Sequence, residues 1–312
     1  MKARAPQVGL LLVVLGLLAV VPLLSGEYIV GILTVSLIYA IWAVSWDFFT
    51  GLSGRENFGY QLFIGVGAYT AASLDVAYGV SPWIGLVAAV LTAAVVGIVI
   101  GYPTLRLRGP YFALATLAAA EIIMHMLVIL WSITGGEDGL SGLTPLFFEP
   151  LHFYYFVFAV AIASTVILVL LARSRWGLLL RAIRGDEAGC QAAGINVTFY
   201  KLAGLAVSAA FAGLGGALYG NYQLHVGPDT MSVMLLISIV SMVYVGGLGT
   251  VYGAAGGAIL LSLLGEFLRG AGEYRLLVYA LVLIFVIFFL RNGLIAPLWQ
   301  KLGGLRHRKL AP

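Results

Sequence analysis

The stretch YIVGILTVSLIYAIWAVSWDFF, residues 28–49, decides the fold class. Asp47 is its single charged side chain, and the rest of the run is almost continuously apolar. A helix rises about 1.5 Å per residue, so a run of this length covers the hydrocarbon core of a bilayer, which is about 30 Å thick. The run lacks the alternation of a barrel strand. It is therefore predicted to be a transmembrane helix.

The same pattern recurs along the chain and predicts an all-α polytopic membrane protein with about ten transmembrane helices. Only 10% of the 312 residues are charged and 62% are hydrophobic, whereas soluble domains average about 25% charged residues. The third, eighth and ninth runs are Gly-rich or short, so these are the ones expected to be broken or re-entrant. The predicted spans are Val8–Leu24, Tyr28–Phe49, Phe58–Tyr78, Pro82–Tyr102, Tyr111–Trp131, Phe153–Leu171, Leu202–Tyr222, Ser232–Leu248, Gly253–Leu268 and Leu276–Leu290.

The positive charges predict the orientation of these spans. With the N-terminus in the cytoplasm, all 17 Lys and Arg residues except Arg269 and Arg275 fall on the cytoplasmic side, as the positive-inside rule requires. Both termini are then cytoplasmic. The net charge of +4 reflects this topology rather than nucleic-acid binding. Residues 8–21 would also suit the apolar core of a signal peptide, but no small-residue cleavage site follows them.

Motifs for enzymatic chemistry are missing. No GxxxxGK[ST] phosphate loop occurs, and the four histidines show no metal-ligand spacing. The single cysteine excludes a disulfide framework. The chain is therefore predicted to be a non-catalytic membrane subunit that binds neither metal nor cofactor.

Four polar residues within or beside the spans are candidates for a translocation path. Glu121 lies near the middle of its span, where a carboxylate costs about 2.5–3.5 kcal/mol on insertion scales, and His125 follows one helical turn later. The two could line a path or form a structural hydrogen-bonded pair. Asn57 and Gln61 have the same spacing; they could hydrogen-bond across helices or line a pore.

Small residues recur every four positions in two places. The first set is Ser208, Ala212, Gly216 and Gly220, and the second is Gly249, Gly253 and Gly257. Such spacing lets helix backbones approach closely. It favours tight packing within this chain, with a face for a second subunit as the alternative.

The segment 172–200 is the longest cytoplasmic connection. Asp186 and Glu187 suit the N-terminal turn of a helix, and Gly194 suits its end. We therefore predict a short helix over Asp186–Ala193, outside the membrane. It could dock a partner, or the segment could be a plain basic loop at the membrane surface.

These residues also carry a family resemblance. The pattern Arg181-Ala182-Ile183-Arg184-x-x-Glu187, followed by Gly194-Ile195-Asn196, resembles the coupling loop of permease subunits in branched-chain amino-acid ABC importers. The blocks Gly109–Ala118 and Thr134–Leu140 are similar to the LivM-type rather than the LivH-type subunit. Further matching blocks are Phe58–Thr70 and Gly246–Ala258.

The resemblance implies a bacterial inner-membrane permease that forms one domain over residues 1–312, with a basic cytoplasmic tail over residues 291–312. It implies a second, LivH-type permease, two cytoplasmic ATPases that bind ATP and Mg, a periplasmic binding protein and a small-molecule substrate. The coupling to the ATPases would be carried by Arg181, Arg184, Asp186, Glu187 and Gly194.

Two alternatives to branched-chain amino-acid import remain at this point. One is the same machinery carrying urea or short amides. The other is a secondary transporter that works without ATP, against which the coupling-loop pattern argues. The segment Arg55-Glu56-Asn57 departs from the commoner family form, where small residues are frequent. This departure leaves the choice of substrate open.

Overall fold

The computed structural model describes residues 5–107, 109–267 and 281. Helices dominate these residues, and the only strands among them, β1 (Leu140–Ser141) and β2 (His225–Val226), form one short antiparallel pair. The predicted all-α class is confirmed. The helices are α1 (Ala5–Leu24), α2 (Glu27–Ser53), α3 (Tyr60–Tyr78), α4 (Pro82–Thr104), α5 (Pro110–Ile129), α6 (Trp131–Thr134), α7 (Pro150–Arg173), α8 (Arg175–Gly185), α9 (Glu187–Ala192), α10 (Val197–Gln223), the 3₁₀ helix η2 (Pro228–Met231), α11 (Val233–Gly246) and α12 (Tyr252–Phe267).

Nine of the ten predicted spans coincide with helices of the structure. The tenth, Leu276–Leu290, and the basic tail over residues 291–312 lie outside the described residues. Within the described residues, five helices are long and apolar enough to cross a membrane, namely α2, α4, α5, α7 and α10. The third span, α3, is one continuous helix, which contradicts the expectation of a break there. The eighth, α11, has 14 residues, fewer than the roughly 20 that a full crossing needs. The ninth, α12, is described as far as Phe267, where this stretch of described residues ends.

Proline marks where three of the long helices begin. Pro82, Pro110 and Pro150 each occupy the first turn of their helix. Proline is favoured there because the first N–H groups of a helix have no intrahelical partner and its fixed φ suits the helix. The sequence alone therefore places these helix starts within one to three residues.

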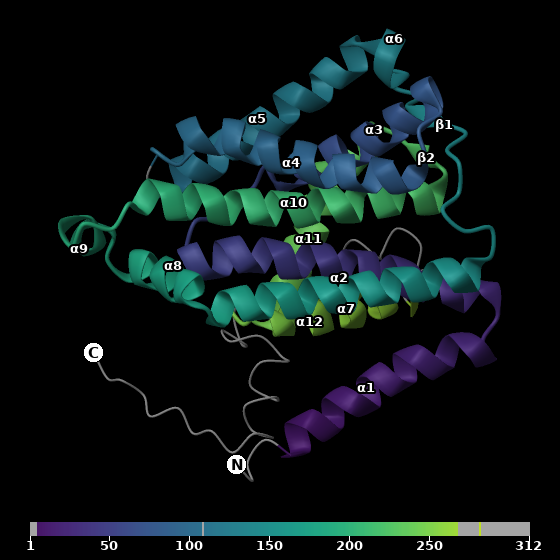
Figure 1. Ribbon diagram of the computed structural model, residues 1–312, viewed down its shortest axis with the longest axis horizontal. Coiled ribbons are helices and arrows are strands. Elements are labelled where there is room, and N and C mark those ends of the chain that lie inside the picture. Colours follow the sequence, from purple (N-terminus) through teal and green to yellow (C-terminus); the bar gives the residue numbers. More distant parts are fainter. Residues whose placement is uncertain (1–4, 108, 268–280, 282–312) are drawn as a thin grey trace.

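The long helices form two packed groups (Figure 1). Helix α10 packs against α3 and α4 on one side and against α2 on the other, and α7 packs against α2. Helix α1 runs along one edge of this bundle. Helices α8 and α9 project at one end, which we call the coupling end, and β1, β2 and α6 lie at the opposite end, which we call the hairpin end.

Small residues bring α10 and α3 into backbone contact. A Cβ on Gly216 would lie 2.1 Å from the carbonyl oxygen of Ile64, and one on Gly67 would lie 2.3 Å from Cα of Gly213. A Cβ on Gly220 would lie 2.5 Å from a side-chain carbon of Val226 and 3.9 Å from Ala68 Cβ. Both glycines thus face other parts of this chain closely.

The second set of glycines is only partly as predicted. Gly253 and Gly257 pack α12 against α11, with virtual Cβ positions 2.5 Å from Gly246 O and 2.1 Å from Met242 O. Gly249 is not on that helical face, because α12 begins only at Tyr252. It lies in the turn after α11 with φ +81°, a conformation that favours glycine. Gly249 therefore does not extend the stripe of Gly253 and Gly257. It packs closely on α2 instead, since a Cβ on Gly51 would lie 2.6 Å from Gly249 Cα.

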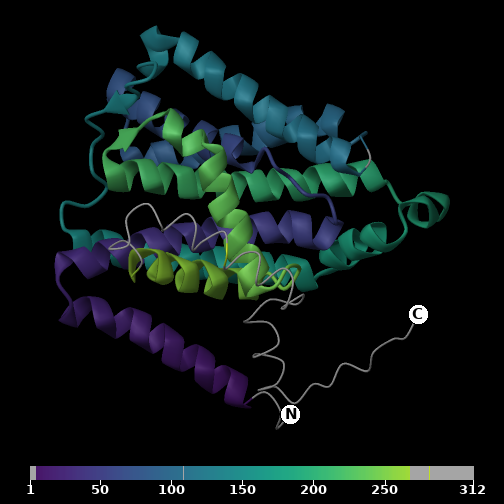
Figure 2. The same ribbon diagram turned by 180° about the vertical axis from the view of Figure 1, so that it is seen from behind.

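Helix α11 differs in direction from the other helices. In Figure 2 it runs across α10 and α2 rather than alongside them. It follows η2, which packs against α3, α5 and α11. The irregular segment lies before the eighth predicted span, and α11 itself is one continuous helix over Val233–Gly246, so the break expected within that span is absent.

Candidate functional site

The predicted helix at Asp186–Ala193 is present as α9, Glu187–Ala192. Asp186 caps it, because its Oδ1 accepts a hydrogen bond of 2.9 Å from the Gly189 N–H. Gly194 follows the helix with φ +80°, as predicted for the end of a helix. The sequence reasoning missed α8, which precedes α9 and buries Leu180 and Ile183 against the bundle.

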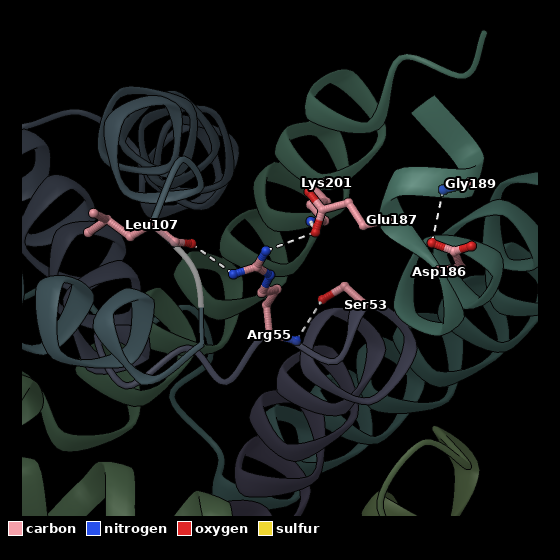
Figure 3. A network of polar contacts seen from close by, with 7 residues as sticks. All are labelled: Ser53, Arg55, Leu107, Asp186, Glu187, Gly189 and Lys201. Atoms are coloured by element: carbon pink, nitrogen blue, oxygen red, sulfur yellow. Dashed lines mark hydrogen bonds and ion pairs between the residues drawn. The ribbon is translucent and has the colours of Figure 1, made fainter. Parts of the chain in front are cut away.

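The Glu187 side chain, which is 36% exposed, points toward Arg55 and Lys201 (Figure 3). Its Oε2 lies 2.9 Å from Arg55 and 2.6 Å from the Lys201 ammonium. Arg55 also donates a hydrogen bond of 2.7 Å to the Leu107 carbonyl. Burial alone would raise the pKa of Glu187, but the hydrogen bonds and positive charges of Lys201 and Arg55 outweigh it and lower that pKa. We call Arg55, Glu187 and Lys201 the ion-pair staple.

The staple joins three segments that are distant in sequence. Glu187 is in α9, Lys201 is in the first turns of α10, and Arg55 follows α2. The Lys201 side chain is only 3% exposed and that of Arg55 is 11% exposed, so both pairs are well shielded from solvent. A buried cation costs free energy unless it is paired. The position of α9 is therefore tied to the helices by electrostatics.

Arg184 makes a second connection between the coupling end and the bundle. It donates a hydrogen bond to the carbonyl oxygen of Gly51, near the end of α2. Its aliphatic carbons lie against Gly54, where a Cβ would approach Arg184 Cγ to 2.8 Å. Arg181 is exposed on the outer side of α8. The two arginines of the pattern thus face different surroundings.

Asp47 fixes the turn between α11 and α12 beside this connection. It is fully buried and accepts hydrogen bonds of 2.6 Å from Gly249 N–H and 2.7 Å from Val251 N–H. A guanidinium nitrogen of Arg184 lies 3.7 Å from the virtual Cβ of Gly249. The end of α2 therefore contacts α8 and the α11–α12 turn together.

A cavity of about 580 Å³ opens beside the staple. It lies between the end of α2, the start of α5 and the α8–α9 segment. Arginine and glutamate side chains face each other across it. Its lining residues are Ser53, Gly54, Arg55, Glu56, Gly109, Pro110, Ala113, Ile183, Arg184 and Glu187.

The structure does not join Glu121 to His125. Glu121 is half-buried, and its Oε1 has no hydrogen-bond partner among the described residues. His125 is exposed on α5. The expected hydrogen-bonded pair is therefore not formed, because four-residue spacing puts two residues on one side of a helix without bringing their side chains together.

Asn57 and Gln61 are both completely buried but are likewise not bonded to each other. Asn57 precedes α3 and its Oδ1 accepts from the Gly59 N–H at 3.0 Å. Its Nδ2, and both amide atoms of Gln61, find no partner within the part of the chain that the structure describes. The spacing of four was misleading here, since helix α3 begins only at Tyr60.

The hairpin end is held by side chains that were not singled out as functional from the sequence. Asp75 accepts hydrogen bonds of 2.5 Å and 2.9 Å from the N–H and hydroxyl groups of Thr144. Asn221 donates to Thr144 O and accepts from Leu146 N–H. Ser141 and His225 bond across the β1–β2 pair at 2.9 Å. The segment between α6 and α7 is therefore ordered against α3 and α10.

The site chemistry is ion pairing and hydrogen bonding. Among the described residues, no group of three or more His, Cys, Asp or Glu side chains could hold a metal ion. Sequence reasoning missed Arg55, Lys201 and Asp47 as parts of this site. The only sequence signal for Arg55 and Lys201 was that each is an isolated positive charge beside a predicted span.

Comparisons with known proteins place most of the chain in one family of transport permeases. Residues 28–287 match the family described as "Branched-chain amino acid transport system / permease component". The high-affinity branched-chain amino acid permease protein LivM of Escherichia coli is 31% identical over 316 residues, covering 92% of this chain and 74% of that protein. A probable permease protein LivH of Methanocaldococcus jannaschii is 28% identical over 272 residues, covering 80% and 85%. A guanosine ABC transporter permease protein, NupQ, of Bacillus subtilis is 23% identical over 249 residues, covering 70% and 77%.

Proposed function

Because the chain belongs to the branched-chain amino acid transport permease family, we propose that it is the LivM-type membrane subunit of an ABC importer for branched-chain amino acids. It does no catalysis of its own and binds no cofactor. Two cytoplasmic ATPases bind ATP and Mg, a LivH-type permease completes the membrane part, and a periplasmic binding protein delivers the substrate. The assembly lies in the bacterial inner membrane, with both termini of this chain in the cytoplasm.

The observation that carries this proposal is the α8–α9 segment. It projects from one end of the bundle (Figure 1) and is tied to it by the ion-pair staple and by Arg184. The outer positions of α9 carry small residues that are exposed, among them Ala188 and Ala192. A helix with small exposed side chains that is held firmly to the bundle is suited to insertion into a partner protein. A force on α9 is then transmitted directly to α2 and α10.

The roles of the five coupling residues follow from their positions. Asp186 caps α9 and Gly194 lets the chain leave it, so both shape the helix. Glu187 and Arg184 fix it to the bundle. Arg181, which is exposed, contacts the ATPase. In free-energy terms, nucleotide binding on the ATPases selects between two arrangements of the spans by contacting them differently.

Reconstitution of the complex tests this proposal. The permease, its second permease, the two ATPases and the binding protein are placed in proteoliposomes, and uptake of labelled leucine, isoleucine and valine is measured with ATP hydrolysis. Hydrolysis that rises with the liganded binding protein, together with uptake, is the expected result. Hydrolysis without uptake of any of the three would contradict it, and guanosine and urea in the same assay would then test the substrates of a relative and of the alternative machinery.

A charge reversal in the staple tests the coupling role. Glu187→Lys places three cations together, so α9 should detach and ligand-stimulated ATP hydrolysis should be lost while the spans stay folded. Glu27→Lys is the matched control, since it makes the same charge reversal at an exposed carboxylate in the first turn of α2, and it should keep the ligand-stimulated hydrolysis. Normal transport by Glu187→Lys would show that the docking role is wrong.

A further inference from the structure

One face of α3 carries buried polar groups that nothing in the fold uses. Gln61 is 0% exposed, yet neither its amide nitrogen nor its amide oxygen has a partner in the described part of the chain. Tyr69, two turns along the helix, is 5% exposed, and its hydroxyl is also unpartnered there. Each such group costs about 1–3 kcal/mol in lost hydration. Native structures seldom accept this cost without a functional reason.

The segment that covers this face is η2. Gly65 lies midway between Gln61 and Tyr69, and a Cβ there would lie 2.1 Å from Met231 Cγ. Met231, the last residue of η2, is 0% exposed. The flexible Met231 side chain thus occupies the space left by the missing side chain of Gly65, between Gln61 and Tyr69. Residues spaced by four lie on one side of a helix, so Gln61, Gly65 and Tyr69 follow one another along α3 beneath η2.

A negative charge stands at the outer edge of this face. Asp229, whose carboxylate is exposed, lies in η2, the segment that packs against α3. At the other edge, Asn57 Nδ2 adds a further unpartnered and fully buried amide donor. Amide donors therefore lie toward the coupling end and an acidic acceptor toward the hairpin end. Gln61 and Tyr69 are eight residues apart on one continuous helix, about 12 Å, whereas an amino acid carries its carboxylate and ammonium on the same carbon. Its head group would therefore meet the amide donors and the acidic acceptor one after the other as it moves along α3.

We infer that the Gln61–Tyr69 face of α3 is where the polar head group of the transported zwitterion binds during passage, and that Met231 on η2 closes this face. The inference rests on the proposed transport function and adds the location of the path. The arrangement described is the closed one, in which Met231 replaces the ligand and leaves the polar groups without partners. Movement of η2 opens the face. Because η2 follows β2 directly, and β2 pairs with β1, a force on the hairpin end reaches it.

Two subtle substitutions test the binding face in the reconstituted complex. Tyr69→Phe removes one unpartnered hydroxyl, and Gln61→Leu removes the amide at nearly constant volume. Each should lower the uptake rate about tenfold, the value of one lost hydrogen bond to a charged ligand, and should leave the thermal unfolding midpoint unchanged or higher. Unchanged uptake in both variants overturns the inference, and so does a fall in stability that matches the fall in uptake.

Tyr154→Phe is the matched control. The Tyr154 hydroxyl is also buried, but it donates to the Leu18 carbonyl at 2.6 Å. This variant should lose stability and keep its uptake per folded complex. A tenfold loss of uptake in this variant too would show that the effect is not specific to the α3 face, which contradicts the inference.

Thiol labelling tests the path without reference to any substrate, so it separates this inference from the proposed function. In a Cys190→Ala background, Gln61→Cys in the whole complex should react with a small water-soluble thiol reagent faster during ATP turnover than at rest. Met231→Ala should speed the reaction at rest. Leu205→Cys, which is equally buried but between α10 and α4, should stay unreactive. A Gln61→Cys variant that is never labelled, or that reacts no faster than Leu205→Cys, overturns the inference even if the wild type transports amino acids.

Discussion

Asp47 shows how a single buried carboxylate can hold a turn inside a membrane protein. It accepts both the Gly249 and the Val251 N–H groups, at 2.6 Å and 2.7 Å. In the low-dielectric interior these donors would otherwise be unsatisfied, because no water reaches them. The charge that interrupts the stretch 28–49 is therefore part of the folded structure.

Asp47→Asn should lower the free energy of unfolding by about 1–3 kcal/mol. An asparagine keeps one acceptor oxygen but turns an NH₂ group toward the second backbone N–H. The thermal unfolding midpoint of the detergent-purified protein measures the loss. Ser36→Ala is the control, since the Ser36 hydroxyl bonds only to Ile32 O in its own helix. Equal midpoints for Asp47→Asn and Ser36→Ala would contradict this role.

Glu187 gives the coupling end a pH dependence of known sign. Its pKa in the folded protein lies below the ordinary value of 4.5, because hydrogen bonds from Lys201 and Arg55 outweigh the effect of burial. A lowered pKa adds stability above the ordinary value, and this stability is lost as the pH falls through the folded pKa. The protection of the α9 amides against hydrogen exchange, taken relative to the intrinsic exchange rate at each pH, should therefore fall below about pH 4.5. In Glu187→Gln that fall should be absent; an unaltered pH profile would show that the staple does not hold α9.

At the scale of elements, the contact of α3 with α10 depends on glycine. Gly216→Ala would place a Cβ 2.1 Å from the Ile64 carbonyl oxygen, and a backbone atom cannot yield as a side chain can. Overpacking of this kind costs about 1–3 kcal/mol, which thermal unfolding measures. Gly16→Ala is the control, because nothing lies within 4 Å of its virtual Cβ. A Gly216→Ala protein as stable as Gly16→Ala would mean that the two helices are not in backbone contact.

Elements were predictable from the sequence wherever length and apolar character determined them, and the structural boundaries of the nine spans fall within a few residues of the predicted ones. Short polar-flanked segments were not. Helix α8 has its apolar residues on one side only, so it gave no span signal. Asn57 and Gly249 were assigned to helical faces, although α3 and α12 begin three residues after each. Helix starts decide such assignments, and spacing alone does not reveal them.

The candidate site was predictable in its local parts only. The cap at Asp186 and the end at Gly194 depend on neighbours in sequence, and both are as expected. The inward direction of Glu187 depends on Arg55 and Lys201, which tertiary folding brings to it from other elements. In the segment Arg55-Glu56-Asn57, which departs from the commoner family form, Arg55 holds α9 in place by pairing with Glu187. The departure at Arg55 therefore gives no information about substrate choice.

At the scale of the whole molecule, polar groups that do structural work gather at the two ends of the bundle. The coupling end carries the staple and Arg184, and the hairpin end carries the Asp75 and Asn221 contacts to the segment between α6 and α7. Helix α3 runs between these ends. Within the described part of the chain it carries unpartnered groups in its first turn, at Gln61, and near its middle, at Tyr69. A displacement imposed at either end thus has a rigid element through which it reaches the middle of the bundle.

The proposed orientation of the two ends can be tested with the native cysteine. Cys190, the single cysteine of the chain, is partly exposed in α9, and we expect it to face the cytoplasm. A membrane-impermeant thiol reagent should therefore leave it unmodified in intact spheroplasts and modify it after lysis. In a Cys190→Ala background, Ser141→Cys in β1 should show the opposite behaviour, because β1 lies at the hairpin end. Labelling of Cys190 in intact spheroplasts would reverse the topology, and the α8–α9 segment could then not meet an ATPase, since ATP hydrolysis takes place in the cytoplasm.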